Sequence, residues 1–221
     1  MSGFSEDGQW WWDGQAWIAT SQVVIPDLGV APSPETSQAM ANRQKLHDAG
    51  NVTMAASLAA REANPIAFGV GLWFLATQVR AFRNLRLWTL QQLTSATTHL
   101  LGLGEPMVAG ETSLYARGAG LGFLYPDAFG RDLSIVVTAA HVLLLAFDSD
   151  AGQPRRVALA ARAVDVVVEA PTPILSQPLI KVRRGPQTWW IRGTTRVIQP
   201  KPVVAAWKAA VSSYRASTAS S

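Results

Sequence analysis

From residue 105 to residue 198 the chain is a succession of short runs rich in Val, Ile and Leu. Turn-forming residues such as Asp148–Gly152 and Gly185-Pro186 separate these runs. Short apolar runs with such breaks predict antiparallel β-strands. Within Leu179–Arg183, apolar and basic residues alternate, so the two kinds of side chain face opposite sides of a strand. This part of the chain is therefore predicted to be rich in antiparallel sheet.

The last apolar segment, PKPVVAAWKAAVSSYRA, has the periodicity of a helix. Val203, Trp207, Val211 and Tyr214 lie on one stripe of that helix. Many antiparallel strands followed by one amphipathic helix predict a small barrel or an orthogonal sandwich that the helix plugs. The predicted fold class is therefore α+β.

The order of these features resembles a bacterial pleckstrin-homology-like domain, including its GRAM-type relatives, over residues 102–214. The resemblance rests on a first strand in GEPMVAGETSLYA, a hairpin in LSIVVTAAHVLLLAF and a terminal helix that carries Trp207. It implies a seven-stranded antiparallel barrel capped by that helix, in a superfamily that binds lipid headgroups, peptides or protein surfaces. The headgroup-binding cluster of such domains follows the first strand, where RGAGLGFLYPD holds one Arg and no Lys. A protein partner is therefore favoured over a phosphoinositide.

The stretch DGQWWWDGQAW holds four of the nine tryptophans of the chain. Asp13-Gly14 predicts a two-residue type I′ hairpin loop, because both residues tolerate a positive φ. This loop pairs Trp10 with Trp17. Since side chains alternate along a strand, Trp10, Trp12 and Trp17 share one face and Trp11 takes the other. A face of three indoles in water promotes association, so we expect that face to be buried and Trp11 to be less buried.

The W-D-G-x-x-W core of this stretch, from Trp12 to Trp17, is similar to a short tryptophan-rich motif of many bacterial proteins of unknown function. An isolated hairpin is marginally stable in water, so the segment is predicted to dock on something larger. Its target is either the helical region of its own chain or a second protein. The four tryptophans are therefore the predicted partner-binding residues.

Composition divides the chain into five predicted parts. Prolines and small residues mark a linker after the hairpin. Residues rich in Ala, Gln, Met and Leu then favour helices. The parts are a hairpin motif at 1–25, a linker at 26–34, a helical region at 35–101, the pleckstrin-homology-like barrel at 102–214 and a disordered tail at 215–221.

Residues 65–79 contain no charged side chain, and Arg80, Arg83 and Arg86 follow at helical spacing. At 1.5 Å per residue this uncharged run rises about 22 Å, short of the roughly 30 Å hydrocarbon core of a membrane. A transmembrane span is therefore disfavoured, and a helix buried in protein is the favoured interpretation. The alternative is a peripheral membrane anchor over residues 65–88, with the three arginines on anionic headgroups.

A second basic cluster, KVRRGPQTWWIRGTTR, interleaves cations with tryptophans in a chain of net charge +4. Lys181, Arg183 and Arg184 are candidate contacts to an anionic surface. Trp189 and Trp190 are candidates for stacking on the bases of a single strand. A barrel strand buries one of two adjacent tryptophans, so a solvated face with one core aromatic is favoured. Nucleic-acid binding stays as a second alternative.

No pattern in the sequence assembles a catalytic or metal site. The chain has no cysteine, and its three histidines, His47, His99 and His141, stand at spacings that fit no metal motif. His141 begins an apolar strand, where a packed or turn histidine is favoured over a ligand. The sequence thus predicts a non-enzymatic binding or scaffold protein without cofactor or metal. Its expected partner is a protein, with a homo-oligomer as an alternative. The first residues lack a secretory pattern, so the expected location is cytoplasmic.

Overall fold

The computed structural model describes residues 3–34, 36–37, 86–112, 133–148, 153–171, 179–192 and 199–219. Contacts divide the chain into two compact units, Met1–Val30 with Thr89–Ser221, and Ala31–Trp88. Every strand that the structure describes belongs to the first unit. In the second unit, the Ser33 hydroxyl accepts a hydrogen bond from the Thr36 N–H at 3.2 Å, which begins a helical turn.

The larger sheet has the order β4-β5-β6-β7, and each neighbouring pair is antiparallel. β5 and β6 form the predicted hairpin, whose innermost pair joins Val137 to Val142. Two register shifts between β6 and β7 are bulges, which increase the local bend and twist of the sheet. The strands are β4 (Ala109–Thr112), β5 (Leu133–Val137), β6 (His141–Asp148) and β7 (Gln153–Arg162).

A second antiparallel sheet, of order β10-β9-β8, follows in the sequence. A short turn, η3 (Ala163–Asp165), leads from β7 into β8, and α4 (Pro200–Ala219) follows the last strand. Gly185 has a φ of 54° in the tight turn between β9 and β10, a conformation that favours glycine. The strands are β8 (Val167–Glu169), β9 (Leu179–Arg184) and β10 (Gln187–Arg192).

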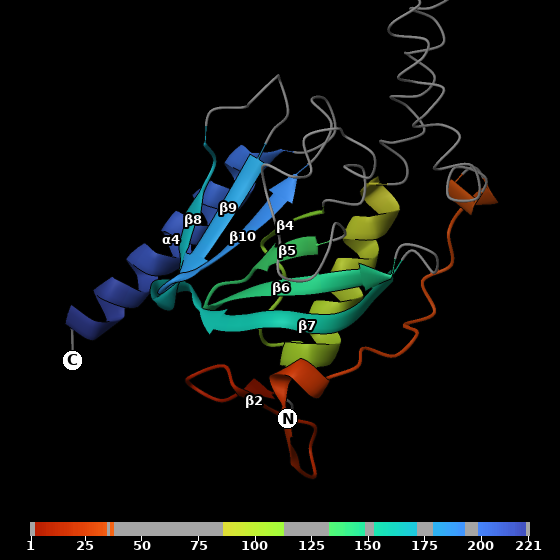
Figure 1. The fold of residues 1–221 in the computed structure, drawn as a ribbon, viewed down its shortest axis with the longest axis horizontal. Helices are drawn as coiled ribbons and strands as arrows, with labels where there is room; N and C mark the ends of the chain where they lie inside the picture. The colour runs from red at the N-terminus through yellow and green to blue at the C-terminus, as the bar shows by residue number, and fades with distance from the viewer. Residues whose placement is uncertain are drawn as a thin grey trace, which may run out of the picture. The chain divides into compact units, whose positions relative to one another are not determined.

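The hydrophobic core lies between the two sheets and α4 (Figure 1). On α4, Trp207 is half-buried, and its indole N–H donates to the Ala163 carbonyl of η3 at 2.9 Å. This bond ties the helix to the corner where the chain passes from the first sheet to the second. The members of the core with 0% exposure are Leu133, Ile135, Val137, Val142, Leu144, Ile180, Val182 and Ile191.

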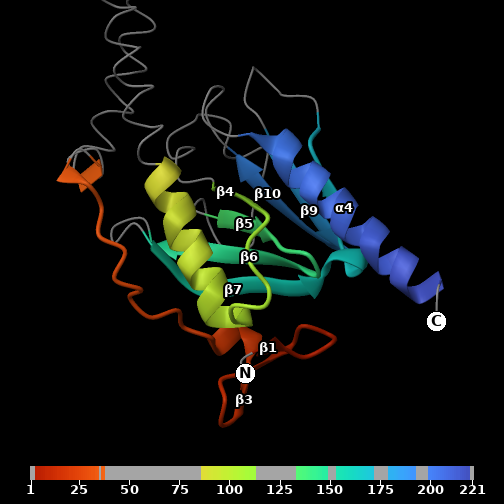
Figure 2. The same ribbon diagram turned by 180° about the vertical axis from the view of Figure 1, so that it is seen from behind.

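The first sheet is covered on its other face as well. A helix over residues 86–101, here called the middle helix, lies across that face with its residues from Thr89 onward (Figure 2). At Gly110 of β4, an added Cβ would lie 3.5 Å from the Leu93 Cδ1 of this helix. All five residues of β5 are buried, as expected of a strand enclosed on both faces. The unit therefore has three layers, with the first sheet in the middle.

The predicted α+β class is confirmed, with strands, turns and a C-terminal helix where the pattern placed them. The predicted boundary at residue 101 does not divide the structure, because the middle helix packs with the strands. The prediction that residues 215–221 form a disordered tail is wrong for residues 215–219. There α4 continues as far as Ala219, because no residue in this stretch breaks the helix. Residues 26–33, within the predicted linker at 26–34, contain neither helix nor strand. The apolar run 65–79 lies outside the described residues.

Leu93→Ala tests whether the middle helix is part of the domain. Leu93 is fully buried, so its truncation leaves a cavity and is expected to lower the free energy of unfolding by about 2–5 kcal/mol. Leu103 is 88% exposed, and Leu103→Ala is expected to change that free energy by less than about 0.5 kcal/mol. Urea unfolding followed by circular dichroism measures both variants. Equal, small effects would contradict the packing of the helix on the sheet.

Candidate partner-binding site

The tryptophan segment forms a small antiparallel sheet of its own. β1 (Gly3–Phe4) pairs with β2 (Trp10–Trp12), and β2 pairs with β3 (Trp17–Ala19). The register places Trp12 opposite Trp17, so the loop comprises the four residues 13–16. The predicted two-residue loop, which put Trp10 opposite Trp17, is therefore wrong.

The side chain of Asp13 explains the longer loop. Its Oδ1 accepts hydrogen bonds from the backbone N–H groups of Ala16 and Gln15, both at 2.7 Å. These two bonds hold the pKa of the Asp13 carboxyl below its usual value. The Asp13 side chain thus accepts from the backbone N–H groups two and three residues later in the chain. This pattern stabilises a four-residue loop in place of the two-residue turn that Asp-Gly favours. As a result, the rings of Trp12 and Trp17 are cross-strand neighbours with centroids 5.5 Å apart.

Trp11 anchors this hairpin to the end of the middle helix. Its indole N–H donates to the Leu100 carbonyl at 2.9 Å, and its ring centroid lies 5.8 Å from that of His99. The last carbonyls of a helix lack a donor within the helix, so the indole satisfies a group that needs a partner. Gly102, with a φ of 79°, then ends the helix. Trp11 is only 7% exposed.

Gly8 holds the other end of the hairpin against β7. A Cβ built on Gly8 would lie 1.9 Å from the Ala160 carbonyl oxygen, closer than any side chain can approach. Gly8 also has a φ of 68°, which favours glycine. The buried Thr20 hydroxyl donates to the Gly8 carbonyl at 2.8 Å, which joins the loop before β2 to the turn after β3. This contact between the two backbones therefore requires glycine.

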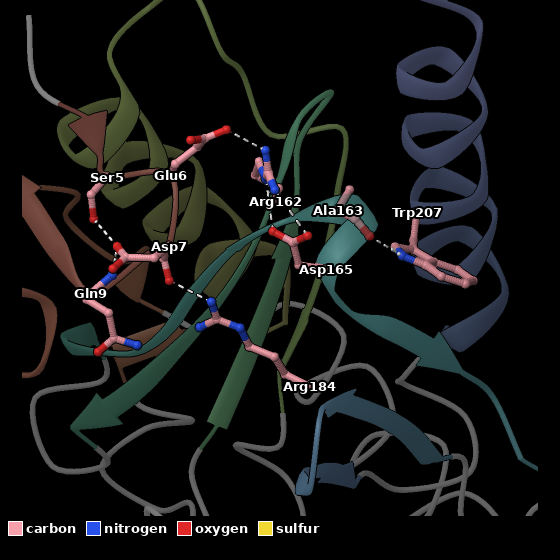
Figure 3. A network of polar contacts seen from close by, with 9 residues as sticks. All are labelled: Ser5, Glu6, Asp7, Gln9, Arg162, Ala163, Asp165, Arg184 and Trp207. Atoms are coloured by element: carbon pink, nitrogen blue, oxygen red, sulfur yellow. Dashed lines mark hydrogen bonds and ion pairs between the residues drawn. The ribbon is translucent and has the colours of Figure 1, made fainter. Parts of the chain in front are cut away.

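Two arginines of the sheets reach the same loop (Figure 3). Arg162 donates to the Glu6 carboxylate at 2.7 Å and to Asp165 at 2.9 Å. Arg184 donates to the backbone carbonyl of Asp7 at 2.6 Å. The hairpin is thus tied to the body of the domain at three places: the helix end, the β7 edge and this loop.

The carboxylate of Asp7 faces its own loop rather than Arg184 (Figure 3). It accepts hydrogen bonds from the Ser5 hydroxyl at 2.6 Å and from the Gln9 N–H at 3.0 Å. These bonds, that from Ser5 first, hold the pKa of Asp7 below its usual value. Arg184 therefore meets a carbonyl at this loop, and its charge forms no ion pair within the part of the chain described here.

Trp10, Trp12 and Trp17 form what we call the outward tryptophan face. Trp10 is 49% exposed, Trp17 is 54% exposed and Trp12 is half-buried. The prediction that these three share a face is confirmed by the register, but the predicted burial is reversed. Of the two predicted targets, its own chain and a second protein, the hairpin docks on its own chain. It does so through the single indole of Trp11. The reason is that Trp11 finds both a hydrogen-bond acceptor and an aromatic neighbour at the helix end.

A cleft of about 630 Å³ lies beside Trp10. One wall comes from the hairpin and the turn after β3, and the floor is Val157–Ala160 of β7. The other wall is the end of the β9–β10 hairpin, from Arg184 to Trp189. Arg184 is the only charged residue among the described ones that line this cleft.

The predicted basic cluster is divided by the fold. Glu169 of β8 pairs with Arg183 at 3.1 Å and lies 4.0 Å from the Lys181 ammonium, so one carboxylate serves two cations. Lys181 also lies 5.3 Å from the centroid of Trp190, which is half-buried. Trp189 is buried, which confirms that one of the two adjacent tryptophans enters the core. Arg86 belongs to the middle helix, and Arg80 and Arg83 lie outside the described residues.

A polar cluster that the sequence did not bring together lies at the β5–β6 turn. The His141 Nδ1 lies 2.8 Å from the Glu105 carboxylate, and the Thr138 hydroxyl donates to the same carboxylate. Burial opposes ionisation of Glu105, but these hydrogen bonds together outweigh it and hold the pKa of Glu105 below its usual value. His141 is thus the turn histidine that the sequence favoured, and it ties the segment after the middle helix to the first sheet.

Comparison with protein-family models and with curated proteins yields no match to this chain. No helix among the described residues is long and apolar enough to cross a membrane. Nor does any group of three His, Asp or Glu side chains gather, in the described ranges, where a metal ion could be held.

Gly8→Ala is expected to loosen the hairpin, because the new methyl group would overlap a backbone carbonyl and occupy a disfavoured φ. We expect a loss of about 2 kcal/mol or more in the free energy of unfolding. Gly3→Ala is the matched control, since a Cβ at Gly3 meets nothing within 4 Å, and its effect should stay within about 0.5 kcal/mol. Thermal and urea unfolding measure both. Equal stability of the two variants would mean that Gly8 does not pack on β7.

Glu105 gives the stability of the domain a pH dependence with a defined sign. Because its pKa in the fold is below its ordinary value of 4.5, ionised Glu105 stabilises the fold above that pH. This contribution is lost as pH falls through the lowered pKa. Glu105→Gln is therefore expected to cost about 1–2 kcal/mol at pH 7, with the difference from the unmodified protein shrinking below pH 4.5.

Urea unfolding at several pH values measures this difference. Asp27→Asn, at an exposed carboxyl, is the control and should change stability little at any of these pH values. A cost of Glu105→Gln that is the same at pH 3 and pH 7 would contradict a role for the ionised carboxylate.

Proposed function

We propose that the protein is a non-enzymatic binding module that engages a protein partner through the outward tryptophan face. The observation that carries this proposal is the half-exposed state of Trp10 and Trp17 on a hairpin whose opposite face is fixed by Trp11. Docking the hairpin on its own chain uses Trp11 and Gly8. It does not use the outward indoles. Exposed tryptophans that cluster on one face are typical of the residues that dominate protein–protein interfaces.

The attachment of the hairpin also suits a binding surface. Trp11, Gly8 and Arg184 hold it at the helix end, at β7 and at the β9–β10 turn. A surface that is already ordered loses little conformational entropy when a partner binds, so more of the contact energy appears as affinity. The location proposed for this interaction is the cytoplasm.

We also propose that the body of the domain is pleckstrin-homology-like. Support comes from the order of elements, which is four antiparallel strands, then three, then a C-terminal helix that carries Trp207. The described sheets are not closed into a barrel, and the middle helix covers a face that a simple barrel leaves to solvent. A binding platform is the role that this resemblance implies.

The membrane and nucleic-acid alternatives receive less support from the described residues. Lys181 and Arg183 are both engaged by Glu169 and so offer a reduced charge to an anionic surface. The residues of the apolar-basic segment other than 86–88 lie outside the described residues.

Affinity purification from the native cell tests the proposal. The unmodified protein is compared with a Trp10→Ser, Trp17→Ser double variant and with a Leu103→Ser control, which removes an exposed apolar side chain elsewhere. We expect a protein partner to co-purify with the unmodified protein and with the control. The amount of partner that co-purifies with the double variant should be lower by about tenfold or more. Circular dichroism checks that all three are folded. A partner that co-purifies equally with all three, or no partner at all, would overturn the proposal.

A further inference from the structure

The floor of the cleft beside Trp10 is the outermost of the described strands of the first sheet. β7 is the last strand in the order β4-β5-β6-β7, and Val157–Ala160 form the part of it that lines the cleft. One end of the same edge already takes an extended segment of the chain itself, because the Ile25 N–H donates to the Arg155 carbonyl at 2.8 Å. Beyond that point no described strand pairs with β7 on this side. A strand edge inside a cleft suits a ligand with an extended backbone.

Among the described residues that line the cleft, the charge is positive and comes from Arg184 in the wall, and none of these residues is acidic. The carboxylate of Asp7, in the loop that Arg184 contacts, is bonded to Ser5 and Gln9 (Figure 3). A guanidinium has five N–H donors, and the contact of one Nη with the Asp7 carbonyl leaves donors for a carboxylate.

The wall of the cleft also carries neutral polar groups. Gln187 and Thr188 supply an amide and a hydroxyl of the kind that bond a peptide backbone. Trp189, beside them, belongs to the hydrophobic core and is 3% exposed.

We infer that this cleft binds a short, extended, acidic peptide segment of the partner. A carboxylate of the peptide pairs with Arg184, its backbone bonds to Gln187 and Thr188, and a neighbouring side chain packs on Trp10. The inference rests on the proposed function for the kind of partner, and it adds the chemistry of the segment that is recognised. A single strand of nucleic acid fits less well, since a groove that follows phosphates presents several cations and the described lining of this cleft presents one.

Selection from a phage-displayed library of random peptides tests the inference without knowledge of the partner. Immobilised full-length protein is expected to enrich peptides with more Asp and Glu than the unselected library contains. The enrichment should disappear on Arg184→Gln and on Trp10→Ala. It should persist on Lys201→Gln, which removes an exposed cation of α4.

Fluorescence anisotropy with one selected peptide then measures affinity. We expect Arg184→Gln, and separately the replacement of the acidic residue of the peptide by its amide, to weaken binding about tenfold or more. Arg184→Lys should bind with an intermediate affinity, because it keeps the charge and loses the fork of donors. Thermal unfolding of both Arg184 variants shows whether the hairpin stays in place when the contact with the Asp7 carbonyl is changed.

Selected peptides without acidic enrichment, or equal binding by Arg184→Gln, would overturn the inference. Tighter binding of a labelled thymidine decamer than of any selected peptide would also overturn it, in favour of a nucleic-acid strand. The acidic-peptide inference can fail while the proposed function holds. A co-purified partner that depends on Trp17 but not on Arg184 would keep the outward tryptophan face and remove the acidic peptide from the cleft.

Discussion

The hydrogen bond from the Trp11 indole to the Leu100 carbonyl decides which face of the tryptophan hairpin meets the domain. Side chains alternate along β2, so the burial of Trp11 turns Trp10 and Trp12 outward. The same bond satisfies a carbonyl at the end of the middle helix, where the helix itself supplies no donor. One indole therefore caps a helix, positions a hairpin and exposes the aromatic surface from which the proposed function follows.

The hairpin also protects the edge of the first sheet. An uncovered edge strand pairs readily with other chains, and natural proteins cover such edges. Here Gly8 packs on Ala160, and Val24 and Ile25 pair with Arg155 and Arg156 near the start of β7. Between these contacts lies the cleft beside Trp10, with Arg184 in its wall. The arrangement thus closes most of an edge and leaves one short stretch of it within reach of a ligand.

The sequence predicted those elements that depend on local patterns. Alternation in Leu179–Arg183 and the break at Gly185-Pro186 were enough to place β9, β10 and their turn. Two adjacent tryptophans were enough to predict that one enters the core. The stripe of α4 was predicted correctly as far as Val211, but Tyr214 is 42% exposed because the helix passes the end of the core there.

The site could not be predicted in the same way, because its determinants are far apart in the sequence. The acceptor for Trp11 is 89 residues away, and the loop register depends on the side chain of Asp13 rather than on the Asp-Gly dipeptide. The cleft joins three segments that no spacing rule connects. One signal in the sequence does indicate the middle helix. The unbroken apolar run Val142–Phe147 of β6, without the alternation of a strand that has one face in water, indicates a strand covered on both sides.

The free energies of unfolding of Trp11→Ala and Trp17→Ala, measured side by side in urea, test the central claim most directly. If Trp11 is the anchor, its removal costs about 3 kcal/mol or more, as expected for a buried tryptophan. Trp17→Ala should then cost within about 1 kcal/mol, the size of its cross-strand contact with Trp12. The opposite order, with Trp17 more costly to remove than Trp11, would mean that the outward tryptophan face is the docked one and would contradict the account.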